Sequence, residues 1–346
     1  MKKLWVVFIL MFGLIGCANE EESIETPPVT TPENVQQEPV EEQEPKTTLQ
    51  FDPVSFEILV PSGSTAMTLA HLSANQPSLG DHVTYSVQPY VQGSDPLVAA
   101  FTSETAQVIV APTNLGATLY QKEVPYQLVA TLVWGNLYLI SNENLTFDDL
   151  EGRKITAFGQ GSTPDIVLQT ILKEKGLLDK VEIEYLASVA DVQAMYAAGE
   201  TDIAVIAEPS LSVLKTKVEN MNVVVDFQQS WGELYGVTSY PQASLFIHKD
   251  LIENHQEVIE PLLAQVEASV EFANQSPKEM ANEAIKTGLD MPQAIIEAAV
   301  PQSHLIFKTA EEAKEEIELY LQKLYEFDAK IVGEALPDDN FYYLSK

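Results

Sequence analysis

Polar turns that follow apolar segments are the parts of this sequence best suited to hold a small molecule. The stretch AFGQGSTPDIVLQTIL at 157–172 contains two glycines, which permit positive φ and a close approach of a ligand to the backbone. Thr163 with Pro164 is a good N-cap and first-position pair, and the free N–H groups at such a helix end attract anions. The same residues also suit a plain cap that satisfies only its own helix. This stretch alone leaves both interpretations open.

Repetition of such turns favours a ligand site. Comparable turns follow apolar segments twice in each half of the chain, and in open α/β sheets ligands bind beyond the carboxyl ends of the strands. If the two halves face each other, the four turns line one cleft. The predicted contacts from these turns are Ser62, Ser64, Thr65, Thr113, Asn114, Gln160, Gly161, Ser162, Thr163 and Glu208.

Aromatic residues form the second part of the predicted site. Trp134 precedes Gly135 and Asn136 where the first half ends, and Trp231 and Tyr235 lie where the second half ends. These rings either pack a hinge or offer flat surfaces to a ring or methyl group of a ligand. We include Trp134, Asn136, Trp231 and Tyr235 among the predicted ligand contacts.

Motifs for catalysis and metal binding are absent from the sequence. It has no G-x-S-x-G, H-E-x-x-H, P-loop or C-x-x-C, and its five histidines show no ligand-like spacing. Glu208 follows an apolar segment and could act as a general base, but no paired acid is visible. We therefore predict no catalytic residue, no metal and no cofactor, and we expect Glu208 to accept a hydrogen bond from a ligand amine or amide.

The elements that must position these residues alternate along the chain. Apolar strands are each followed by a polar or proline-bearing turn and a helix, which predicts parallel sheets covered on both faces. After a further strand at 244–248 the chain is expected to be helical. The predicted strands are 56–60, 82–87, 107–111, 126–140, 154–158, 181–186, 202–207 and 223–227, and the late helices are 255–274, 277–288, 292–299 and 309–327.

The N-terminal segment indicates export and lipidation. Lys2 and Lys3 precede a short apolar run that ends in Leu-Ile-Gly-Cys, and this tetrapeptide resembles the lipobox of bacterial lipoproteins, whose cysteine is acylated. We predict a signal peptide at 1–16 and lipidation of Cys17, which is the only cysteine. The alternative is an ordinary secretory signal with an incidental cysteine. Residues 17–51, rich in glutamate and proline, are expected to form a disordered tether.

Composition restricts the partners of the remaining chain. The net charge of the full chain, −32, argues against nucleic acid and phospholipid headgroups as partners, although a few local donors can still hold a small anion. The residues after the tether are enough for two lobes with separate cores. We expect a monomer.

Several stretches together resemble the solute-binding lipoproteins of ABC importers, and within them the SsuA/THI5-like branch for sulfonate, nitrate, taurine and thiamine precursors. The stretches are SGST at 62–65, VAPTNLGATLY at 110–120, WGNLYLI at 134–140, GRKITAFGQGSTPD at 152–165 and GETDIAVIAEP at 199–209. The resemblance implies a two-lobe type II periplasmic-binding-protein fold with two crossover strands and extra C-terminal helices. Lobe 1 would be 52–139 plus 241–346, and lobe 2 would be 140–240.

The resemblance also implies a function and its partners. The protein would be lipid-anchored on the extracytoplasmic face of the cell membrane, close its lobes on a small solute, and deliver it to an ABC permease and its ATPase. Ser162 and Thr163 would hold an anionic or carbonyl end, and Glu208 would receive a donor. The solute would be anionic, amine-bearing or both, with or without a ring. The alternatives are an enzyme on this fold, similar to the menaquinone-pathway dehydratases, and a ligand-sensing surface lipoprotein.

Overall fold

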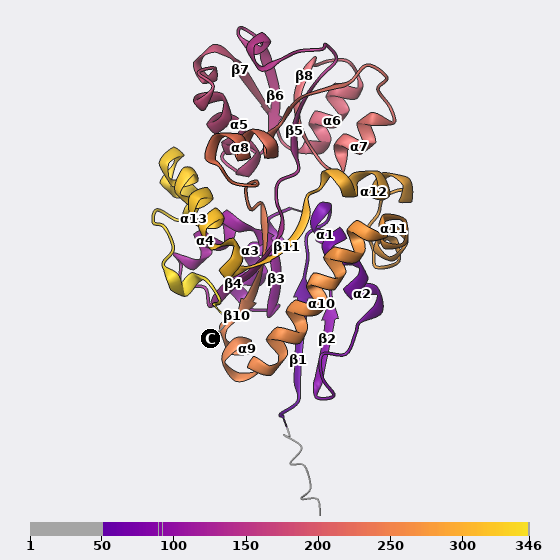
Figure 1. The fold of residues 1–346 in the computed structure, drawn as a ribbon, viewed down its shortest axis with the longest axis vertical. Coiled ribbons are helices and arrows are strands. Elements are labelled where there is room, and N and C mark those ends of the chain that lie inside the picture. Colours follow the sequence, from indigo (N-terminus) through magenta and orange to yellow (C-terminus); the bar gives the residue numbers. More distant parts are fainter. Residues whose placement is uncertain (1–50, 89, 92, 345–346) are drawn as a thin grey trace, which may run out of the picture. The chain divides into compact units, whose positions relative to one another are not determined.

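The computed structural model describes residues 51–88, 90–91 and 93–344. The expected signal peptide, the lipidation at Cys17 and the tether up to residue 50 lie outside these residues. Phe51–Lys346 form one compact unit that contains two sheets, each covered by helices (Figure 1). Within the described residues, every helix is too short or too polar to cross a membrane.

The larger sheet has six strands in the order β11-β4-β10-β3-β1-β2. Strand β1 pairs in parallel with β2 and β3, whereas β10 is antiparallel to both β3 and β4, and β11 is antiparallel to β4. We call this sheet with its helices lobe 1. Its strands are β1 (Val54–Leu59), β2 (Val83–Val87), β3 (Val108–Pro112), β4 (Tyr126–Val133), β10 (Ala243–His248) and β11 (Leu305–Thr309).

The smaller sheet has five strands in the order β7-β6-β8-β5-β9, and with its helices we call it lobe 2. Strand β6 is parallel to β7 and β8, whereas β5 is antiparallel to β8 and β9. The expectation of parallel sheets is therefore wrong for three strands: β5 and β10 each enter their sheet directly from the other lobe, and β11 is an antiparallel edge strand. The strands are β5 (Leu137–Ser141), β6 (Lys154–Phe158), β7 (Glu182–Leu186), β8 (Ile203–Ala207) and β9 (Asn222–Asp226).

Helices cover both sheets. Those of lobe 1 are α1 (Ser64–Thr68), α2 (Ala70–Asn75), α3 (Asp95–Ser103), α4 (Thr113–Tyr120), α9 (Lys249–Asn254), α10 (Gln256–Gln275), α11 (Pro277–Lys286), α12 (Gln293–Ala299) and α13 (Ala310–Phe327). Those of lobe 2 are α5 (Thr163–Glu174), α6 (Val189–Ala197), α7 (Ser210–Lys215) and α8 (Phe227–Tyr235). Short 3₁₀ turns are η1 (Phe147–Leu150), η2 (Leu178–Lys180), η3 (Val300–Gln302), η4 (Ala329–Val332) and η5 (Asp339–Phe341).

Helix α13 illustrates why the late helices form. Thr309 and Glu312 make a reciprocal capping box at its start, which satisfies two backbone N–H groups. Its apolar stripe is buried, as the spacing predicts, at Ala313, Ile317, Tyr320, Leu321 and Leu324. Strand β11, by contrast, lies in a region expected to be helical. It is a short, mostly half-buried edge strand paired with β4.

Two chain crossings join the lobes and pack against each other. The first, 134–136, links β4 to β5, and the second, 236–242, links α8 to β10. Gly135 has a φ of 79°, and a Cβ at this position would lie 2.6 Å from Gln228 Cγ and 2.8 Å from Tyr240 Cζ. The Oγ of Ser239 donates to the carbonyl oxygen of Trp134 at 2.7 Å. Close packing of the crossings thus requires a glycine here.

Candidate functional site

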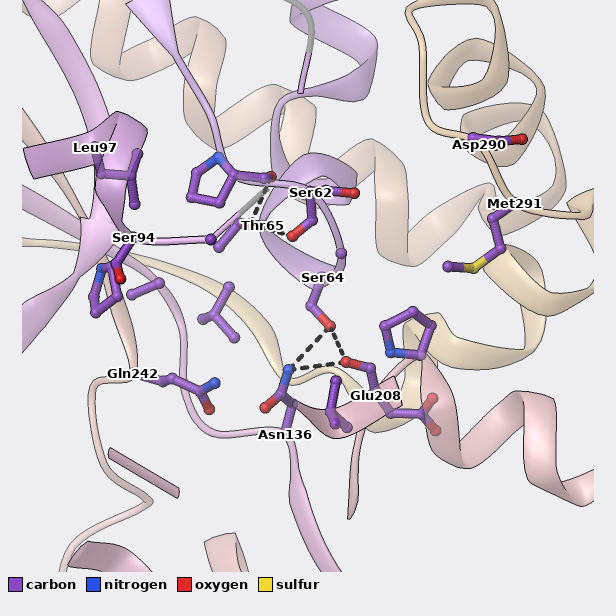
Figure 2. Close-up of a pocket in the computed structure, with 18 residues that line it drawn as sticks. Ser62, Ser64, Thr65, Ser94, Leu97, Asn136, Glu208, Gln242, Asp290 and Met291 are labelled. Atoms are coloured by element: carbon purple, nitrogen blue, oxygen red, sulfur yellow. Dashed lines mark hydrogen bonds between the residues drawn. The ribbon is translucent and has the colours of Figure 1, made fainter. Parts of the chain in front are cut away.

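A cavity of about 460 Å³ lies where the two lobes meet, and lobe 1 provides most of its wall (Figure 2). Lobe 2 contributes the start of α6 and the turn after β8, and the first crossing contributes Asn136. The lining residues are Pro61, Ser62, Gly63, Ser64, Thr65, Gly93, Ser94, Leu97, Pro112, Val133, Asn136, Val189, Glu208, Pro209, Gln242, Ala243, Asp290 and Met291.

Three of these residues tie together the segments that surround the cavity. The side-chain nitrogen of Asn136 donates to Ser64 Oγ and to the carbonyl oxygen of Glu208, both at 3.2 Å (Figure 2). The backbone N–H of Glu208 donates to the carbonyl oxygen of Asn136 at 3.0 Å. Ser64 Oγ also lies 3.0 Å from Ser303 Oγ. Lobe 1, the crossing and lobe 2 therefore meet at one hydrogen-bonded point.

The turn at 61–65 is shaped by local hydrogen bonds. Thr65 Oγ1 donates to the carbonyl oxygen of Pro61 at 2.8 Å, and the N–H of Ser62 donates to Val91 at 2.8 Å. Gly63 adopts a φ of 92°, which glycine reaches without steric cost. This conformation turns the chain from β1 into α1 and places Ser64 against the crossing.

Glu208 is buried, and its carboxylate is already paired. The two carboxylate oxygens accept from the N–H of Ser212 at 3.2 Å and from Ser212 Oγ at 3.0 Å, both in α7. Burial raises the pKa of Glu208 from 4.5 to about 7, while the Ser212 hydrogen bonds and Lys215 lower this pKa. Its carbonyl oxygen faces Ser64, and its carboxylate points away toward α7 (Figure 2).

Two lining residues have buried side-chain oxygens without a hydrogen-bond partner. These atoms are Oδ1 of Asn136 and Oε1 of Gln242. Both are acceptors, so both can receive a donor from a ligand. Among the described residues, no group of three or more His, Cys, Asp or Glu side chains is placed to hold a metal ion.

The structure brings only part of the predicted contact set to the cavity. Ser62, Ser64, Thr65, Asn136 and Glu208 line it. Thr113 instead lies behind the wall, where its Oγ1 is 2.8 Å from Ser244 Oγ, and its neighbour Pro112 lines the cavity.

The turn at 160–163 contacts lobe 1 directly and does not line the cavity. Thr163 Oγ1 donates to Asn114 Oδ1 at 3.2 Å and lies 3.1 Å from the hydroxyl of Tyr320. Asn114 is in α4 and Tyr320 in α13, so this cluster, which we call the latch, bridges the two lobes. The side chains predicted to face a ligand at this turn are therefore used to hold the lobes together.

Local hydrogen bonds shape this turn at the start of α5. The N-cap is Ser162, one residue earlier than expected, and its Oγ donates to the carbonyl oxygen of Gly159 at 2.6 Å. The N–H of Gly161 donates to Asp165 Oδ2 at 2.8 Å. Gln160 and Gly161 are exposed. The hydroxyl of the N-cap residue thus bonds within the turn and leaves the N–H groups at the start of α5 without a side-chain cap.

The predicted aromatic contacts pack the region around the crossings. The indole N–H of Trp134 donates to the carbonyl oxygen of Ile306 at 3.0 Å, and Lys308 Nζ lies 4.4 Å from the ring centroid. Trp231 packs edge-on against Tyr235, with ring centroids 4.7 Å apart, and against Tyr240 at 5.6 Å. Trp134, Trp231 and Tyr235 do not line the cavity, so the structure supports the hinge-packing alternative.

Four polar or sulfur-containing residues that line the cavity were not among the predicted contacts: Ser94, Gln242, Asp290 and Met291. A signal for Ser94 was present, because GSDP at 93–96 has the same glycine, serine and proline spacing as GSTP at 161–164. In both places the proline occupies the first turn of a helix. Asp290 and Met291 precede Pro292, which is the N-cap residue of α12 and not part of its first turn. Gln242 lies in the second crossing and carries no comparable motif.

Comparison with known proteins identifies a family and a fold. A family model described as NMT1/THI5 like matches residues 90–280, which is more than half of the chain. No curated protein gives a match. Among solved structures, an ABC transporter from Parabacteroides distasonis is 22% identical with a TM-score of 0.75, covering 85% of this chain and 99% of that one.

Two further structures have the same fold. The periplasmic aliphatic sulphonate binding protein SsuA from Escherichia coli is 18% identical with a TM-score of 0.66, covering 85% of this chain and 93% of that one. The alkanesulfonate-binding protein SsuA from Xanthomonas axonopodis pv. citri bound to MOPS is 16% identical with a TM-score of 0.60, covering 84% and 96%. These similarities confirm the expected periplasmic-binding-protein fold.

Proposed function

This chain belongs to the NMT1/THI5-like family, and we propose that it is an extracytoplasmic solute-binding protein that delivers a small molecule to an ABC importer. The observation that carries the proposal is the cavity of about 460 Å³ with walls from both lobes. A volume of this size suits a small molecule. The names of the similar structures, an ABC transporter and two sulfonate-binding proteins, support the same role.

Capture follows from the position of the cavity. A solute seated there contacts the 61–65 turn of lobe 1 and the 208–209 turn of lobe 2 at once. Contacts made only when both lobes touch the solute favour the closed arrangement, and a permease can then recognise the closed pair of lobes. The chain would act without changing the solute chemically, in contrast to an enzyme on this fold.

A cavity-blocking variant tests the proposal. Ser94 is exposed at the start of α3 and lines the cavity, so Ser94→Trp fills space without opening the core. Ser103→Trp, at the exposed far end of the same helix and outside the cavity, is the matched control. Solutes found by a thermal-shift screen of the full chain would be measured by isothermal titration. We expect binding to be lost in Ser94→Trp and retained in Ser103→Trp; equal affinities would contradict the proposal.

We also propose that Cys17 carries the lipid that anchors the protein to the outer face of the cell membrane. The support is the Leu-Ile-Gly-Cys tetrapeptide at 14–17 behind a short apolar run. Two or more acyl chains give stable attachment, whereas one gives only marginal attachment. The acidic, proline-rich segment that follows would let the folded lobes reach a permease. The protein would act there as a monomer.

A further inference from the structure

We infer that the cavity takes a small organic cation, such as a protonated amine on an apolar body, and discriminates against oxyanions. This inference rests on the proposed function and deepens it by naming the class of solute. It departs from the sulfonates that two of the similar structures are named for binding.

The charged groups of the lining are all acidic. Glu208 and Asp290 are the only ionisable side chains among the described residues that line the cavity, so no Lys, Arg or His is among them. Lys215, whose charge lowers the pKa of Glu208, lies outside the lining and donates to Gln302 Oε1. The Glu208 carboxylate is turned toward Ser212 in α7, so an oxyanion in the cavity would meet the Asp290 carboxylate and no cationic side chain of the lining.

An unpaired acceptor is the second, independent observation. Asn136 is 6% exposed, and its Oδ1 has no hydrogen-bond partner. Its orientation is fixed, because Nδ2 donates to the carbonyl oxygen of Glu208, which can only accept. In Figure 2 the oxygen is turned toward the side of the cavity where Gln242 lies. A ligand N–H is the group that this buried oxygen lacks.

Physical chemistry favours a cation in such a site. Moving an anion out of water requires compensating charge or donors, and like charges at short range oppose its entry. The net charge of −32 adds to this opposition and attracts cations from solution. The remaining lining, which includes Leu97, Val133 and Met291, suits an apolar body next to the charged nitrogen.

Charge-matched probes test the inference on the full chain. Butylamine, 1-butanol and butanesulfonate form one triplet, and benzylamine, benzyl alcohol and benzenesulfonate form another, within larger libraries of amines, neutral alcohols and oxyanions. Thermal shift at equal concentration would identify binders, and isothermal titration would give their affinities. We expect stabilisation in the amine arm, with the best amine bound about tenfold or more tightly than its sulfonate counterpart.

A variant of Asp290 tests whether amines bind in this cavity. Asp290 is exposed at the cavity mouth, and Asp290→Asn is expected to weaken amine binding about two- to fivefold, as loss of an exposed charge pair does. Asp179→Asn, also exposed but in lobe 2 and outside the lining, is the control and should not change amine affinity. Binding confined to oxyanions, or indifferent to charge, would overturn the inference and leave the proposed function intact. Absence of binding in every arm would contradict the proposed function itself.

Discussion

Glu208 shows how a residue chosen from sequence acquires a different role in the fold. Its position after a buried strand suggested a carboxylate aimed at a ligand. In the structure the carboxylate accepts twice from Ser212, and the carbonyl oxygen of Glu208 joins Asn136 and Ser64 at the cavity. The side chain therefore holds the start of α7, while its backbone contributes to the site.

The raised pKa of Glu208 predicts a pH dependence of stability. Below pH 4.5 the group is protonated in both states, so it has no effect. Between pH 4.5 and about 7 the folded state keeps a proton that the unfolded state releases, so the free energy of unfolding falls as pH rises. Above about 7 the loss is constant, on the order of 3 kcal/mol.

The Glu208→Gln variant removes this titration. The difference in unfolding free energy between the variant and the wild type should increase from pH 4.5 to 7 and then stay level, on top of a constant offset from the altered Ser212 contacts. Urea unfolding across this pH range measures it. Glu200→Gln, which changes the charge at an exposed site, is the control. A difference that does not vary with pH would refute the assignment.

Gly135 gives a second prediction at the scale of single residues. Gly135→Ala places a Cβ against Gln228 and Tyr240 at positive φ, so it should destabilise the fold by about 2–5 kcal/mol. Gly161→Ala shares the positive φ, but nothing lies within 4 Å of its Cβ, and about 1–2 kcal/mol is expected. The unfolding free energies of both variants, measured with denaturant, separate the cost of steric overlap of the Cβ from the cost of backbone strain. Equal losses would mean that the crossings are not tightly packed.

At the scale of elements, strand–turn–helix periodicity was sufficient to predict most strands and the late helices, whereas the two-lobe fold was implied by the resemblance to solute-binding lipoproteins. The spacing of apolar residues within one strand or helix is a local property of the sequence, and it predicts elements such as β3 and α13. Sheet direction, edge strand β11 and the choice among turns depend on contacts distant in sequence. Nothing in the GSTP stretch distinguishes a turn that faces a ligand from one whose Thr163 contacts Asn114 and Tyr320.

The latch between α5, α4 and α13 predicts a change in lobe opening. Thr163→Val keeps the shape of the side chain but removes both contacts of its hydroxyl, and a typical hydrogen bond is worth about 1 kcal/mol. The closed-to-open ratio of the solute-free protein should fall about fivefold. Small-angle scattering would show a larger radius of gyration. The control is Thr216→Val, because the exposed hydroxyl of Thr216 bonds only Val213 in its own turn; this variant should have the same radius of gyration as the wild type. An unchanged radius of gyration in Thr163→Val would contradict the role of the latch.

At the scale of the whole molecule, the sequence divides into the N-terminal segment 1–51, with the predicted signal peptide, Cys17 and acidic tether, and the two-lobe unit. The sequence of this N-terminal segment predicts that acyl chains on Cys17 attach the protein to the membrane. In a bacterial host, Cys17→Ser should move the protein from the membrane fraction to the soluble or secreted fraction, because the acyl chains have no acceptor. Fractionation with mass spectrometry of the N-terminus measures this. A Cys17→Ser protein that stays in the membrane fraction, with its amount there unchanged, would exclude lipidation as the anchor.

The claim on which the whole account depends is that a solute sits in the cavity beside Ser64 and Asn136. Its most direct test is a crystal structure of the full chain with the tightest solute from the screen. We predict density for the solute within hydrogen-bonding distance of Asn136 Oδ1, enclosed by the 61–65 and 208–209 turns. Density at the 160–163 turn, or on an outer surface with this cavity empty, would contradict the account.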